Sequence, residues 1–175
     1  LAKDTTCDYR LLVAGDGPQS DWLKQQTERH FPGKIVQLGH LEKEKLSDYY
    51  ANADIFVHPN PHEPFGIAPL EAMASGVPTI APNMGGILSY ATDENCWLSN
   101  PDAEDFAAAV REIVSDEDIR NSKIANALTT ARNNSREAST DRLFATYDEI
   151  YEDFHRRKEF FIDLEAVKKY DFADL

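Results

Sequence analysis

Residues 58–86 read HPNPHEPFGIAPLEAMASGVPTIAPNMGG. This stretch places Glu63 and Glu71 eight residues apart around Gly66, and it contains no lysine or arginine. Pro69 suits the first turn of a helix, where its missing N–H would have no partner anyway. Gly76 is a residue type that commonly ends a helix. The stretch therefore predicts a strand end, a loop, a short helix and a further strand in close succession.

The start of this short helix is a candidate anion site. Gly66 lets the backbone approach a ligand closely. Phe65, Gly66 and Ile67 would present free amide groups where the helix begins. Those amides and the helix dipole together favour a negatively charged ligand.

The two glutamates suggest which anion would bind. On one continuous helix they would lie about 12 Å apart along the axis and about 80° apart around it, so Glu63 must lie in a loop that folds back over the helix start. A carboxylate only accepts hydrogen bonds, and it can accept two from a vicinal diol. A nucleoside diphosphate sugar carries hydroxyls on both sides of its phosphates. The alternative is that Glu71 is a solvated helix residue and Glu63 only a charge that favours the helix dipole.

Strands and helices alternate around this stretch. Apolar runs near 10–14, 34–38, 54–57 and 78–81 predict parallel strands of one sheet, and ENCWLS predicts a short fifth strand. The segments 20–31 and 42–53 predict helices, the first with Trp22 and Leu23 facing inward. This alternation predicts an α/β fold with a doubly wound parallel sheet, whose carboxyl edge carries the loop at Glu63.

The chain is expected to become helical from Ala103 onward. Phe106, Val110, Ile113 and Val114 share one face of the first helix, with Asp102 or Asn100 as its cap. A later helix carries apolar residues at helical spacing, namely Leu143, Phe144, Tyr147, Ile150, Tyr151 and Phe154. We therefore divide the chain into a domain at 1–135 and a C-terminal helical segment at 136–175.

Composition excludes several classes of protein. The formal net charge of −13 over 175 residues disfavours binding to nucleic acid or an anionic membrane. Cys7 and Cys96 form neither a CxxC motif nor a disulfide framework, and we expect both to be buried thiols in a reducing compartment. The sequence shows neither a membrane span nor a signal peptide, so we expect a cytoplasmic protein.

A metal site is disfavoured. His58 and His62 are four residues apart, which would suit two ligands on one helix face. The prolines at 59, 61 and 64 exclude a regular helix there. We expect no metal.

The run EPFGIAPLEAMASGVPTIAPNMGG resembles the Glu-x7-Glu signature of retaining GT-B glycosyltransferases of family 4, also called glycosyl transferases group 1. The blocks LLVAGDGP, VQLGHLEKEKLSDYYANADIFVHP and DAEDFAAAVREIV agree with the family in the same order. The resemblance covers roughly residues 8 to 115. The spacing of two glutamates is weak evidence by itself, whereas several ordered blocks are strong evidence.

The resemblance implies a Rossmann-like, C-terminal donor-binding domain and a role for each matching residue. Glu71 matches the glutamate that binds the ribose, and Glu63 matches the one that contacts the transferred sugar and would act in catalysis. The amides of Phe65, Gly66 and Ile67 match those at the sugar and diphosphate. His40 and Leu41 match a place where the base is held by backbone contacts.

The resemblance also implies what these residues do not contain. The first strand matches the second strand of the family domain, so the Arg and Lys that neutralise the diphosphate and the N-terminal acceptor domain fall outside the match. We therefore expect the 175 residues alone to be inactive. The substrate would be a UDP- or GDP-sugar with no cofactor, and nothing indicates that the full enzyme associates with a membrane.

Two other functions stay open. GT-B folds also carry sugar-nucleotide epimerases and phosphorylases, which would use the same sheet and diphosphate site. A non-catalytic module that binds nucleotide sugars is the third reading. Transfer of a hexose, such as mannose or glucose, to an unidentified acceptor is the interpretation we favour.

Overall fold

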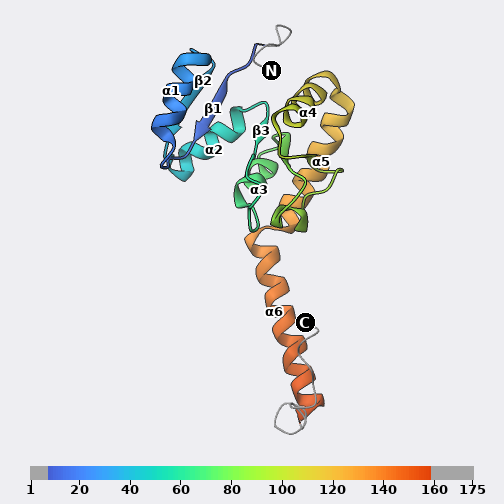
Figure 1. Cartoon of the computed structure of the whole chain (residues 1–175). Helices are drawn as coiled ribbons and strands as arrows, with labels where there is room; N and C mark the ends of the chain where they lie inside the picture. Colours follow the sequence, from blue (N-terminus) through green and yellow to red (C-terminus); the bar gives the residue numbers. More distant parts are fainter. Residues whose placement is uncertain (1–7, 159–175) are drawn as a thin grey trace. The chain divides into compact units, whose positions relative to one another are not determined.

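The structure is a computed structural model that describes residues 8–158. The chain divides into two compact units, at 1–130 and 131–175. Figure 1 traces the helices and strands along the chain. Cys7 lies outside the described residues, as does the end of the expected C-terminal segment.

The first part of the first unit is a β-α-β arrangement. Strand β1 (Leu11–Ala14) pairs in parallel with β2 (Ile35–Gly39), and α1 (Ser20–His30) connects them (Figure 1). These elements confirm the expected strands and helix. The inward placement of Trp22 is wrong, because the side chain is 58% exposed. A helix beside only two strands has too little apolar surface to cover an indole.

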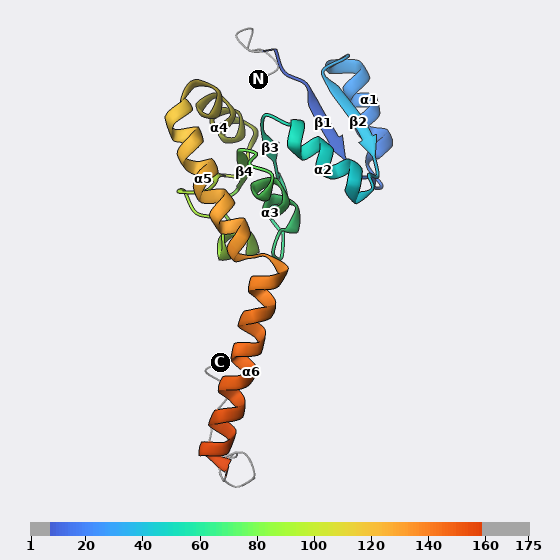
Figure 2. The ribbon, with the colours of Figure 1, turned by 180° about the vertical axis from the view of Figure 1, so that it is seen from behind.

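The second part of the unit contains residues 58–86, with both Glu63 and Glu71. Helix α2 (Lys43–Asn52) precedes a parallel sheet in the order β3-β4-β5. Figure 2 shows α3 beside this sheet. The elements are β3 (Phe56–Val57), α3 (Ile67–Ala74), β4 (Thr79–Pro82), the 3-10 turn η1 (Gly86–Ser89) and β5 (Trp97–Ser99).

The expectation of one sheet is wrong for the described strands, which form two hydrogen-bonded sheets, β1-β2 and β3-β4-β5. A doubly wound sheet runs in the order 3-2-1-4-5-6, so strands that follow one another in sequence need not be neighbours. If β1 to β5 correspond to the strands numbered 2 to 6 in this order, the neighbouring pairs among them are β1-β2, β3-β4 and β4-β5. These are the pairs observed. The parallel direction and the alternation with helices are as expected.

Two apolar clusters hold the second part together. One surrounds the central strand β4 and contains Ile80, Trp97, Ala109 and Ile113. The other joins α2 to α3 and β3 through Tyr50, Ala72, Val77, Leu46 and Phe56. Buried Met73 shows that α3 is buried along one side, as its run of apolar residues requires.

The helices α4 (Ala103–Ser115) and α5 (Glu117–Asn133) follow β5. Asp102 caps α4 by accepting bonds from the amides of Glu104 and Asp105, which confirms one of the two expected caps. Phe106, Val110 and Ile113 contact the core as expected. Val114 does not, because its position on the helix leaves it 54% exposed.

The second unit contains α6 (Arg136–Arg156), capped by Ser135. Five of its large apolar side chains are exposed by 51–65%, namely Leu143, Phe144, Tyr147, Ile150 and Tyr151, whereas Phe154 is partly buried. The helix is confirmed, and so is the expectation that part of its apolar face is open. Among residues 8–158, no helix is long and apolar enough to cross a membrane.

The buried core of α4 supplies a stability test. Ile113 is 2% exposed and its neighbour Val114 is 54% exposed. We expect Ile113→Ala to lower the free energy of unfolding by about 2–5 kcal/mol, because it leaves a cavity beside β4. Val114→Ala should change it by no more than about 0.5 kcal/mol. Urea unfolding of the 175-residue chain compares the two variants, and equal effects would contradict the assigned helix face.

Candidate functional site

The loop that follows β3 is shaped by its prolines. Residues 59, 61 and 64 are proline, and none of the residues between β3 and α3 is helical. A helix interior cannot accept this spacing of prolines, because each lacks an N–H donor and clashes with the preceding turn. Helix α3 therefore begins only at Ile67, and Glu63 belongs to the loop.

Glu63 folds back over the start of α3. Its Cγ lies 3.3 Å from the position that a Cβ on Gly66 would occupy. Asn60 Nδ2 donates a hydrogen bond of 3.2 Å to Glu63 Oε2, and His58 Nε2 lies 3.6 Å from the same oxygen. This is the loop geometry that the sequence required for both glutamates to face one ligand.

The N-terminus of α3 is open. Its cap residue Gly66 has a φ of 90°, in the left-handed region that favours glycine, and no side chain accepts a hydrogen bond from the first turn. The first amides of a helix have no partner within the helix, and Ile67 is 68% exposed. Amides and dipole at this point favour an anion.

The segment 85–90 packs against this loop. The amide of Gly86 donates to the carbonyl of Glu63 at 2.9 Å. A Cβ on Gly86 would lie 1.6 Å from the carbonyl oxygen of Pro64, so only glycine permits this approach of two backbones. The Phe65 ring lies 5.2 Å from that of Tyr90 in an edge arrangement, and Phe65 itself is 43% exposed.

Glu71 is held from α2. The buried Tyr50 Oη donates to Glu71 Oε2 at 3.4 Å. Burial, followed by the charge of Glu71, raises the pKa of Tyr50 to about 12. Tyr50 therefore stays a neutral donor, and the Glu71 carboxylate keeps lone pairs for other hydroxyl groups.

His40 and Leu41 lie elsewhere on the first unit, between β2 and α2. The ends of β1 and β2 meet here, because the amide of Gly15 donates to the carbonyl of Gly39 at 2.8 Å. Hydrogen bonds from Ser20 and from the Gly17 amide lower the pKa of Asp16, and His40 adds to this effect. Within residues 8–158, no hydrogen bond or ring contact joins His40 or Leu41 to Glu63 or Glu71.

The loop before α3 and α3 itself contain carboxylates but no lysine or arginine. Between Lys45 and Arg111 the sequence contains no lysine or arginine. Burial lowers the pKa of His58, and the charge of Glu63 opposes this effect only in part. At neutral pH the loop and α3 therefore present amides and carboxylates rather than side-chain cations.

Three partners of the site were not identified as functional from sequence. The sequence marks His58 only as a possible metal ligand, and no motif in it marks Tyr50 or Tyr90 as functional. Spacing along the chain carries no signal for them, because Tyr50 and Tyr90 come from α2 and from the end of η1. No group of three or more candidate metal-ligating side chains gathers in the described part of the chain.

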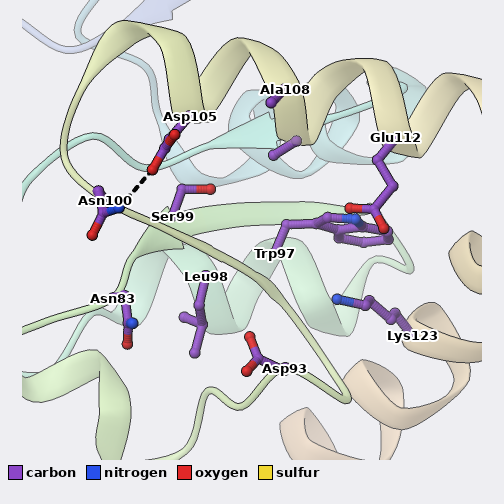
Figure 3. Close-up of a pocket in the computed structure, with 11 residues that line it drawn as sticks. Asn83, Asp93, Trp97, Leu98, Ser99, Asn100, Asp105, Ala108, Glu112 and Lys123 are labelled. Atoms are coloured by element: carbon purple, nitrogen blue, oxygen red, sulfur yellow. Dashed lines mark hydrogen bonds between the residues drawn. The ribbon is translucent and has the colours of Figure 1, made fainter.

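A separate cavity of about 520 Å³ lies along β5 and α4 (Figure 3). Trp97, Glu112 and Lys123 contribute to its walls, and the Lys123 ammonium lies 4.6 Å from the centroid of the Trp97 ring. Asn100 donates to Asp105 at its rim, at 2.6 Å. Neither glutamate of the Glu-x7-Glu pair lines this cavity, so the candidate site is the open surface at α3.

The fold and the site define a class of protein. Parallel strands alternate with helices, and the loop after β3 leads into a helix whose N-terminus no side chain caps, as in Rossmann-like domains that receive a phosphate group there. The chain belongs to the glycosyltransferase family described as glycosyl transferases group 1, whose family model matches residues 1–130.

Curated relatives agree with this assignment. An uncharacterized glycosyltransferase of Methanocaldococcus jannaschii is 34% identical over 67% of this chain and 31% of its own length. A GDP-mannose-dependent alpha-mannosyltransferase of Corynebacterium glutamicum is 32% identical over 82% of this chain and 34% of its own length. The chain thus spans about a third of these relatives.

Solved structures share the fold. The C-terminal domain of a glycosyl transferase group 1 protein from Francisella tularensis has a TM-score of 0.64 at 24% identity, covering 74% of this chain and 71% of that one. An Anabaena protein, HepE, in complex with UDP and glucose has a TM-score of 0.69 at 23% identity, covering 80% of this chain and 40% of that one. This chain resembles the C-terminal domain of GT-B glycosyltransferases.

The contact between His58 and Glu63 supplies a pH test. We expect the His58 ring to titrate below its ordinary pKa of 6.5, because burial disfavours the charged form. Glu63→Gln should lower this pKa further, because it removes the charge that favours the imidazolium. Glu71→Gln is the matched control and should leave it unchanged. NMR titration of the ring protons measures each midpoint, and an upward shift in Glu63→Gln would contradict the geometry.

Proposed function

We propose that this chain is the donor-binding domain of a retaining glycosyltransferase that transfers a hexose from a UDP- or GDP-sugar to an acceptor. The observation that carries the proposal is the open N-terminus of α3 beside the folded-back carboxylate of Glu63, with Glu71 further along the same helix. The family membership supports the class of reaction.

The diphosphate is placed at the start of α3. The amides of Phe65, Gly66 and Ile67 are the candidate donors, since no side chain caps this helix end. Amides that are fixed before the ligand arrives can stabilise the charge that develops on a leaving diphosphate without reorganising. These amides can donate hydrogen bonds to the anionic diphosphate, whereas a carboxylate can only accept them. The two carboxylates are therefore assigned to hydroxyl groups.

Each glutamate is assigned to the hydroxyl groups of one sugar of the donor. Glu71 lies about 7.5 Å along α3 from Gly66, given the rise of a helix, and takes the ribose. Glu63 lies directly over the helix start and takes the hexose, where it would orient the sugar as the diphosphate departs. Asn60 and Tyr50 hold the two carboxylates by neutral hydrogen bonds, which leaves their charge available to sugar hydroxyls.

The base is assigned to the backbone at His40 and Leu41. These residues follow β2 at its carboxyl end, where ligands of doubly wound sheets bind. Two relatives suggest the two candidate nucleotides, since one is GDP-mannose-dependent and the other is a structure with UDP. Hexose transfer in the complete enzyme, measured with UDP-glucose and GDP-mannose, distinguishes this proposal from epimerisation, phosphorolysis and binding without turnover.

Glu71→Ala tests the ribose contact in the complete enzyme. We expect donor affinity to fall by roughly 1.5–3 kcal/mol, because hydrogen bonds to a charged group are lost. Each 1.4 kcal/mol corresponds to about tenfold in the dissociation constant. Calorimetric titration measures the change. Glu94→Ala, an exposed carboxylate outside the site, is the control, and an unchanged affinity in Glu71→Ala would reject the ribose role.

Glu63→Gln tests the sugar contact. We expect turnover to fall while affinity for UDP or GDP stays within about twofold, because the side chain contacts the hexose and not the nucleoside diphosphate. Steady-state kinetics with the sugar donor and calorimetry with the free diphosphate separate the two effects. A loss of diphosphate affinity as large as the loss of turnover would show that Glu63 acts elsewhere.

A further inference from the structure

The hydroxyl of Tyr90 reaches the backbone of the candidate site. It donates a hydrogen bond of 2.5 Å to the carbonyl oxygen of Gly66, the cap residue of α3. Tyr90 is 7% exposed, and its ring also contacts that of Phe65. The bond joins the end of η1 to the start of α3, across 24 residues of sequence.

Peptide geometry turns this bond into a constraint on the site. The described chain contains no cis peptide bond. In a planar trans peptide the C=O and the N–H point in opposite directions. When Tyr90 holds the Gly66 carbonyl toward the buried phenol, the N–H of the same peptide, which belongs to Ile67, must point away from it. The first N–H groups of a helix have no partner within it, so that direction leads out of the N-terminus of α3.

Glycine with a φ of 90° occupies a region that few other residues adopt. The carbonyl of an N-cap residue accepts the first bond of its helix, and the phenol gives the Gly66 carbonyl a second partner that comes from another segment. A Cβ at this position would lie 2.8 Å from Tyr90 Oη, so the phenol occupies the space that a larger residue would need. The hydrogen bond from Tyr90 therefore requires glycine at position 66.

Tyr90 is itself fixed by a buried amide. Asn95 is 6% exposed, and its Nδ2 donates to the carbonyl of Tyr90 at 2.9 Å and to Thr130 Oγ1 at 2.8 Å. Asn95 Oδ1 accepts the amide of Thr92 at 2.8 Å. The position of the phenol is thus tied to the turn after η1 and to α5.

The phenol is held in its donor form. Burial raises the pKa of Tyr90 well above its ordinary value, and the charges of Cys96 and Glu63 raise it further. At any physiological pH the hydroxyl keeps its proton and can donate it to the Gly66 carbonyl.

We propose that Tyr90 is a positioning residue for donor binding, which aims the Ile67 amide at the diphosphate through the Gly66 peptide. The role rests on the proposed function, because it assumes that the amides at the start of α3 meet the donor. Tyr90 does not touch the ligand. It fixes the direction of the Ile67 N–H, which is the group that would contact the ligand.

The test uses the 175-residue chain labelled with ¹⁵N, with UDP and GDP as probes. Tyr90→Phe removes the hydroxyl and keeps the ring, and Tyr49→Phe, at a tyrosine that is 37% exposed on α2, is the matched control. The residual dipolar coupling of the Ile67 N–H reports the direction of that bond without any ligand. Titration with each diphosphate then reports binding at the same amide.

We expect Tyr90→Phe to change the Ile67 coupling and to weaken UDP or GDP binding by about threefold to tenfold. Tyr49→Phe should change neither. Replacing Tyr90 by 4-aminophenylalanine restores a hydrogen-bond donor and should recover most of both effects. A purely structural role would lower the unfolding midpoint and leave the coupling and the affinity of the folded chain as they are.

The outcomes separate this proposal from the one on which it rests. If the unchanged chain binds a diphosphate at Ile67 and Tyr90→Phe binds it equally well, the positioning role is wrong and the proposed function stands. If the unchanged chain shows no response at Phe65, Gly66 or Ile67 to either diphosphate at millimolar concentration, the assignment of these amides fails, and the role of Tyr90 fails with it. Should Tyr90→Phe not fold, the 4-aminophenylalanine variant alone must reproduce both the coupling and the affinity of the unchanged chain, and a failure to do so would overturn the proposal.

Discussion

The candidate site depends on the close contact between two backbone segments, the loop before α3 and the turn at Gly85 and Gly86. The amide of Gly86 bonds to the carbonyl of Glu63, and no side chain fits between them. This contact holds the loop that carries Glu63 and Phe65 against that turn.

The polar groups of the site are of two kinds, carboxylates on the one hand and backbone amides with the helix dipole on the other. Asn60 donates a hydrogen bond to Glu63 and Tyr50 donates one to Glu71, while burial lowers the pKa of the neighbouring His58 and disfavours its charged form. Negative carboxylates suit hydroxyl groups, whereas amides and the dipole of α3 suit a phosphate. Because both kinds of group lie on α3 and on the loop that precedes it, one small surface offers partners to both parts of a nucleotide sugar.

The two sheets show how the fold supports this surface. The central strand β4 is buried on every residue, and its cluster with β5 and α4 gives the second sheet a firm core. Among the described residues, β1, β2 and α1 contain no buried residue. The residues proposed for catalysis and ribose binding all belong to the better packed part, which suits groups that must be held in fixed positions.

The sequence by itself determined the alternation of strands and helices, the short helix at α3, the loop position of Glu63 and the family, because these follow from local rules for proline, glycine and apolar spacing and from ordered motifs. Only the tertiary structure decided that the described strands form two sheets and that Trp22 and Val114 are exposed, since both depend on what packs against an element. It alone revealed the bonds from Tyr50 to Glu71 and from Tyr90 to Gly66. Their partners lie 21 and 24 residues apart, and no local pattern encodes a contact that arises only when separate elements pack together.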